Sequence, residues 1–132
     1  MMKNPLYIVL QGKRINDIPS FYQMINQELM PDESWEIGTL DGLEDLLYGG
    51  LGRLKDYDGL VINWENIDYS REALGMETTL AYYRKKLEPN SPFNKPYFQK
   101  QLEDLEQGKG KTYFDIILEI ISGRPNVQLI KA

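Results

Sequence analysis

Histidine and cysteine are both absent from the 132 residues of this chain. Their absence excludes Ser-His-Asp and Cys-His nucleophilic chemistry, imidazole acid–base catalysis, disulfide bonds, and zinc sites built from those side chains. Any catalysis would depend on carboxylates, lysine, tyrosine, or a hard metal ion held by oxygen ligands. The composition therefore favours a binding protein over an enzyme, and we expect neither catalytic residues nor a cofactor.

Long apolar runs are also missing from the sequence. The most apolar stretch, residues 116–121, is interrupted by Glu119 and is far shorter than a bilayer-spanning helix. The N-terminus lacks the basic, apolar and cleavage-site regions of a secretory signal. Apolar residues make up 42% of the chain, which is enough to bury one core. We therefore expect a cytoplasmic protein with a single domain over residues 1–132.

Positive charge is absent from one long stretch of the chain. No lysine or arginine occurs from Ile15 to Gly52, whereas eight acidic residues do, so this stretch carries −8. Because the whole chain carries −5, all other residues together carry +3. A local excess of negative charge disfavours direct nucleic-acid binding, which needs cations against phosphates. It indicates a basic protein as the partner.

The segment from Thr39 to Gly50 predicts a short acidic helix with a threonine N-cap and a glycine stop. Asp41, Glu44 and Asp45 share one face of this helix and have no lysine or arginine beside them. Like charges three and four residues apart destabilise a helix by about 0.2–0.5 kcal/mol per pair. The cations of a partner would turn this repulsion into attraction and speed association.

Alternating strand and helix signals predict an α/β fold with a small parallel sheet. Compact β-branched and aromatic runs predict two buried strands, at Leu6–Leu10 and Gly59–Trp64, with Trp64 in the core, and a final strand at Val127–Ile130. Helical spacing predicts one helix with Ser20 as its N-cap and Gln23 completing a capping box, and a short helix capped by Asn66. It also predicts a helix at Thr112–Ser122 that is apolar almost all round and therefore buried.

The order of these segments resembles the barstar family, the intracellular inhibitors of secreted bacterial ribonucleases. The resemblance is carried by Leu6–Leu10, Ile18–Tyr22, Trp35, Leu40–Gly49 and Leu60–Trp64. In the family, an aromatic residue precedes an acidic helix that has a Leu-Asp-x-Leu-x-Asp pattern and closes on a glycine. The segment Leu40-Asp41-Gly42-Leu43-Glu44-Asp45 has this pattern. The similarity covers residues 6–74 and 112–130 and implies a small parallel sheet with helices packed mainly on one side.

The resemblance implies a function by occlusion, in which the acidic helix and the preceding loop enter the cationic active site of a ribonuclease. The carboxylates of the inhibitor then take the places of RNA phosphates. Asp45 matches the central carboxylate of the family, and Asp41 matches the carboxylate one turn earlier. Trp35 approximates the aromatic residue that covers the catalytic pocket, and Glu119 is the nearest match to a further acidic contact.

Two departures from the family pattern bear on the choice of partner. The aromatic residue of the family on the helix is Glu44 here, and the aromatic residue after the closing glycine is Gly50. The partner therefore need not be the same ribonuclease, although Tyr48 is placed to supply part of the missing aromatic contact. We predict a ribonuclease or nuclease toxin as the partner and this chain as its immunity protein. The predicted partner-binding residues are Trp35, Asp41, Glu44, Asp45, Tyr48 and Glu119.

Residues 76–110 lie outside the resemblance and predict a helical hairpin inserted before the last helix. The first helix of the hairpin would carry Leu80, Tyr83 and Leu87 on one face. The second helix would carry Phe98, Leu102 and Leu105 on one face. An alternative alignment matches residues 75–87 to the last helix of the family, but residues 112–122 directly precede the final strand and are preferred. The basic cluster Arg84-Lys85-Lys86 is typical of a solvated face. The insertion could widen the partner interface or mediate self-association.

Other interpretations of the acidic helix remain open. Acidic residues are common near a helix start because of the helix dipole, and Trp35 and Tyr48 could simply be packing aromatics. The acidic face could belong to an adaptor that docks on a basic protein other than a nuclease. A third possibility is a hydrolase that uses Asp41, Glu44 and Asp45 as ligands for Mg²⁺, although three carboxylates on one short helix rarely converge on one ion.

Overall fold

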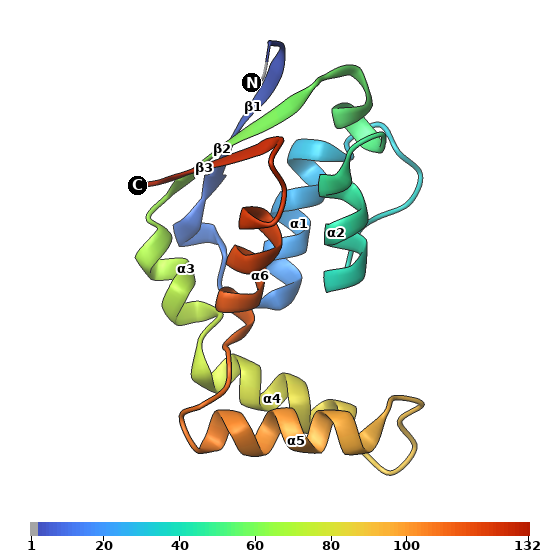
Figure 1. The fold of residues 1–132 in the computed structure, drawn as a ribbon, viewed down its shortest axis with the longest axis vertical. Coiled ribbons are helices and arrows are strands. Elements are labelled where there is room, and N and C mark those ends of the chain that lie inside the picture. Colours follow the sequence, from blue (N-terminus) through green and yellow to red (C-terminus); the bar gives the residue numbers. More distant parts are fainter. Residues whose placement is uncertain (1–2) are drawn as a thin grey trace.

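Three parallel strands form one sheet in the order β1-β2-β3 in the computed structural model, which describes residues 3–132 (Figure 1). The elements in chain order are β1 (Pro5–Gln11), η1 (Gly12–Arg14), α1 (Ile18–Leu29), α2 (Leu40–Tyr48), η2 (Gly52–Asp56), β2 (Gly59–Glu65), α3 (Ile67–Ala73), α4 (Met76–Lys86), α5 (Lys95–Glu106), α6 (Tyr113–Ser122) and β3 (Val127–Lys131). The α/β fold with a small parallel sheet is therefore confirmed.

The sheet has one covered face and one open face. Alternate residues of β1 are buried, and the register places all three beside buried residues of β2 and two of them beside half-buried residues of β3. The rows on the covered face are Leu6-Leu60-Val127 and Ile8-Ile62-Leu129. The open face exposes Tyr7, Val9 and Ile130. The helices therefore pack mainly on one side of the sheet, as predicted (Figure 1).

Trp64 is the centre of the main core, as predicted, and it is completely buried. Its ring lies between Phe21 of α1 and Phe114 of α6, with ring centroids 5.9 and 5.5 Å away. The indole Nε1 donates a hydrogen bond to Ser70 Oγ at 3.0 Å, and Ser70 Oγ donates to the Gly12 carbonyl at 3.0 Å. This chain of bonds joins the end of β1, the end of β2 and α3 through buried groups.

A buried pair of tyrosines links α1 to α6. The Tyr22 and Tyr113 hydroxyls are 2.5 Å apart and share a hydrogen bond. Burial raises the pKa of the Tyr22 phenol, and burial also raises the pKa of Tyr113, to about 12. Both phenols therefore stay neutral at physiological pH and supply a polar contact inside the core.

Two local predictions were wrong, and a third, the Asn66 cap, is confirmed in its position but not in a side-chain hydrogen bond. Helix α1 begins two residues before Ser20, because Asp17 is the N-cap and Ser20 is the third helical residue of the capping box. Asn66 stands at the start of α3 in a left-handed conformation and makes no side-chain capping bond. Helix α6 begins after its Thr112 cap as expected, but it is not buried all round, since Ile116 and Ile120 are half-buried.

Residues 76–110 form the predicted helical hairpin, with α4 and α5 packed on each other (Figure 1). The hairpin has a small core of its own that is separate from the main core, made by Leu80, Tyr83, Leu102 and Leu105. In Figure 1 the hairpin lies below the body that the sheet and the other helices form. No helix between residues 3 and 132 is long and apolar enough to cross a membrane.

Candidate protein-binding site

Helix α2 presents the acidic face that the sequence predicted. Thr39 caps the helix by accepting a hydrogen bond from the Gly42 N–H at 3.0 Å, and Gly49 ends it with a φ of 108°. The opposite face is buried through Leu43, Leu46 and Leu47. Asp41, Glu44, Asp45 and Tyr48 are all exposed. The packing of the leucines therefore holds the acidic side chains towards solvent on a fixed backbone.

The three carboxylates of α2 have no counter-ion within the described part of the chain. The ion pairs among residues 3–132 involve other acidic side chains, and none reaches Asp41, Glu44 or Asp45. A cluster of exposed, uncompensated carboxylates is an electrostatic liability for an isolated domain. The same cluster is complementary to a cationic surface.

A groove between α2 and α6 brings Glu119 to the acidic face. Asp41, Glu44 and Glu119 line it together with Leu40, Ile116 and Ile120, and its volume is about 410 Å³. The structure thus joins a carboxylate that lies 75 residues beyond Glu44 in the sequence to those of the acidic helix. We call this the acidic groove.

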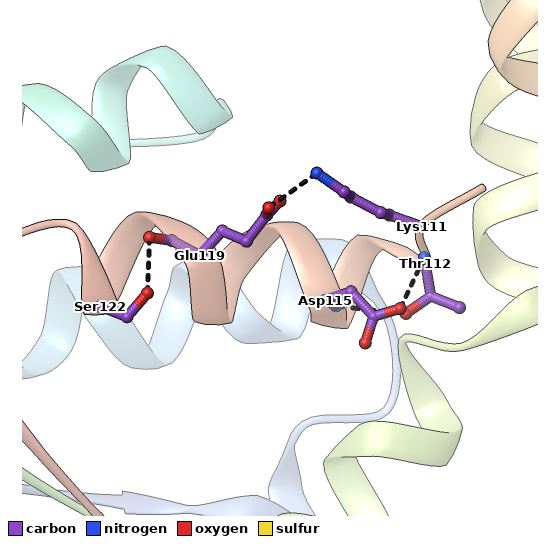
Figure 2. Close-up of polar contacts among 5 residues, drawn as sticks. All are labelled: Lys111, Thr112, Asp115, Glu119 and Ser122. Carbon is purple, nitrogen blue, oxygen red and sulfur yellow. Dashed lines mark hydrogen bonds and ion pairs between the residues drawn. The ribbon is translucent and has the colours of Figure 1, made fainter. Parts of the chain in front are cut away.

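Glu119 differs from the α2 carboxylates because it already has a counter-ion. The Lys111 ammonium donates to Glu119 Oε1 at 2.7 Å, from the segment that joins the hairpin to α6 (Figure 2). The Thr112–Asp115 capping box lies next to this ion pair and fixes the start of the helix (Figure 2). Both side chains of the pair are more than half exposed, so a partner's cation can compete with Lys111.

The two predicted aromatic contacts are exposed. Tyr48 is 74% exposed, and the guanidinium of Arg124 lies 5.1 Å from the centroid of its ring. Trp35 is 45% exposed and lies in the loop that leads into α2. Both rings are therefore available for contact, as the sequence led us to expect.

Asn26 anchors the loop that carries Trp35, and sequence reasoning did not identify it. Its side chain is buried on α1, where it donates to the Ile37 carbonyl and accepts from the Ile37 N–H, both at 2.8 Å. The sequence did contain a signal for Asn26, because it is a polar residue on the otherwise apolar face of a predicted helix. Through Ile37, Asn26 fixes the backbone two residues after Trp35 and two residues before the cap of α2.

Metal binding receives no support from the arrangement of the acidic side chains. No group of three or more acidic residues between residues 3 and 132 is placed to hold a metal ion. Asp41, Glu44 and Asp45 project from one face of a short helix, whereas a metal site needs oxygen ligands that converge on one point.

Neutralising Asp45 is expected to stabilise the protein slightly. Asp45 lies in the C-terminal half of α2 and repels Asp41 one turn away, so Asp45→Asn should raise the free energy of unfolding by about 0.3 kcal/mol. Asp41→Asn is the matched control, because Asp41 lies in the first turn, where the helix dipole favours a negative charge. Urea denaturation checks both variants. A loss of stability in Asp45→Asn would show that this carboxylate has a structural role.

Neither the comparison with protein-family models nor the comparison with curated proteins finds a match.

Proposed function

We propose that this protein is a barstar-like inhibitor that binds and occludes the cationic active site of a ribonuclease. In this proposal it acts as the immunity protein of a bacterial nuclease toxin. The observation that carries the proposal is the set of exposed carboxylates on α2 that have no counter-ion among residues 3–132. The partner-binding residues are Trp35, Asp41, Glu44, Asp45, Tyr48 and Glu119.

The geometry of α2 supports inhibition by mimicry of RNA phosphates. A ribonuclease binds its substrate through lysines and arginines, and a rigid row of carboxylates offers those cations a ready-made alternative. Thr39 and the three buried leucines hold this row in place before binding, which lowers the entropy cost of association. Trp35 and Tyr48 flank the row with exposed rings that can cover apolar surface around an active site.

The test is capture and inhibition with a charge-reversed variant. The wild-type chain and Asp41→Lys/Asp45→Lys are immobilised, and each is exposed to a lysate of the source cells. Each retained protein is then assayed for RNA cleavage with and without the free chain. We expect the wild type to retain a ribonuclease and block its cleavage, and we expect the variant to do neither. Each α2 carboxylate should contribute at least about 30-fold to affinity, the level of an interface hot spot.

The control is Glu72→Lys/Glu88→Lys, which changes the net charge by the same amount at exposed positions away from the acidic groove. This variant should retain and inhibit the same ribonuclease as the wild type. If a basic protein without nuclease activity is captured instead, the adaptor function is correct and the inhibitor function is wrong. Equal inhibition by the charge-reversed variant and the wild type would also contradict the proposal.

A further inference from the structure

A second groove adjoins the acidic groove, and five of its eleven lining residues are aromatic. It lies between the start of α2 and the hairpin, and its volume is about 430 Å³. Tyr82 of α4, Phe93 of the connecting loop, and Tyr97 and Phe98 of α5 line it on the hairpin side. Leu40 and Asp41 line both grooves, so the two adjoin at the start of α2. We call this second groove the aromatic groove.

The aromatic groove already holds a cation from its own chain. The Lys86 ammonium lies 3.6 Å from the centroid of Phe93, 5.1 Å from that of Tyr82 and 5.7 Å from that of Phe98. Lys86 is half-buried, which corrects the prediction that this part of the basic cluster is a solvated face, whereas Lys85 is exposed. The faces of the rings therefore form a site that attracts positive charge.

Lys86 contacts the rings of this site but forms no ion pair there within the described residues. No carboxylate among residues 3–132 lies within ion-pair distance of its ammonium, and burial together with the neighbouring Lys85 charge lowers its pKa. Asp41 also lines the groove, and its carboxylate makes no ion pair with any cation of residues 3–132. Burial raises the pKa of the Tyr82 phenol, and the nearby Tyr97 and Asp41 raise it further.

We propose that the aromatic groove binds an arginine side chain of the basic partner, and that Lys86 occupies this position in the unbound protein. The inference rests on the proposed function and extends its interface onto the hairpin. A guanidinium is flat, more weakly hydrated than an ammonium, and able to stack on a ring while it pairs with a carboxylate. It would therefore use the rings and Asp41 together, whereas Lys86 uses the rings alone.

The first measurement is an NMR titration of the wild-type chain with blocked hexa-arginine and with blocked hexa-lysine. Both peptides should shift the signals of α2, because both are cationic. Hexa-arginine alone should shift the ring signals of Phe93 and Tyr97, and it should bind about threefold more tightly, the equivalent of one exposed cation–π contact. Phe93→Ser should remove this preference and leave the binding of hexa-lysine unchanged.

A second pair of variants tests the role of Lys86. Lys86→Met removes the competing ammonium and keeps the apolar stem, so hexa-arginine should bind at least about threefold more tightly. Lys85→Met is the matched control, because it changes the net charge equally at an exposed neighbouring position. It should change the affinity for hexa-arginine by less than about twofold, as expected for an exposed charge.

The possible outcomes separate this inference from the proposed function. Equal affinities for the two peptides, with shifts confined to α2, would overturn the arginine site and leave the acidic interface in place. No response of the rings to either peptide would overturn it as well, and so would equal effects of Lys86→Met and Lys85→Met. If the rings discriminate between the peptides but no ribonuclease is inhibited, the arginine site stands and the inhibitor function fails.

Discussion

Gly12→Ala is expected to destabilise the protein by about 3 kcal/mol, at the upper end of the usual cost of overpacking a core. Gly12 lies where β1 passes into η1, directly against the end of β2. A Cβ atom there would lie 2.3 Å from the Glu65 carbonyl oxygen and 2.4 Å from that of Asn66. Both are backbone atoms, so the clash cannot be relieved by a side-chain rotation. The same shift would strain the hydrogen bond from Ser70 Oγ to the Gly12 carbonyl.

Urea denaturation measures this loss, and Gly38→Ala is the matched control. A Cβ at Gly38 would meet no atom within 4 Å, and its φ is not in the positive range. Gly38→Ala should therefore keep the wild-type stability or gain a few tenths of a kcal/mol, because alanine restricts the unfolded chain. If the two variants unfold at the same urea concentration, the close approach of β1 to the end of β2 is wrong.

The main elements of the fold could be predicted because each follows from a local signal. The apolar runs at Leu6–Leu10 and Gly59–Trp64 became β1 and β2, and helical spacing located both helices of the hairpin. The errors arose where two local signals compete. Ser20 is a good N-cap in isolation, but Pro19 fits the first turn of a helix equally well, and this places the start at Ile18, with Asp17 as the cap.

The candidate site could be predicted only in part, because part of it depends on how a helix and the loop beside it pack. The exposure of Asp41 and Asp45 followed from the spacing of leucines within one helix. The ion pair of Lys111 with Glu119 and the contact of Lys86 with Phe93 could not be predicted in this way. Each joins residues on different elements or loops whose relative placement is set by tertiary structure. Charge counts along a sequence also do not reveal which cations are already paired.

Asn26→Ala is expected to reduce the free energy of unfolding by about 2–4 kcal/mol. The change leaves the Ile37 N–H and carbonyl without their partner, and Ile37 is almost completely buried. Each buried, unsatisfied backbone group costs about 1–3 kcal/mol. Gln27→Ala is the control, since Gln27 is the exposed neighbour on the same helix and should lose less than about 0.5 kcal/mol. Urea denaturation of both variants measures the difference.

The same variant separates a role in stability from a role in the site. The Asn26 side chain holds the backbone of Ile37, which lies between Trp35 and the cap of α2. Loss of the Asn26 side chain should therefore loosen this loop before the rest of the protein unfolds. Amide hydrogen exchange at Ile37 should then accelerate by more than the change in global stability explains, while the amides of β2 follow the global change. Equal acceleration in both places would mean that Asn26 stabilises the whole fold and does not specifically position the loop. If the loop alone is released, a folded Asn26→Ala protein should bind the proposed ribonuclease partner more weakly even though every α2 carboxylate is still present.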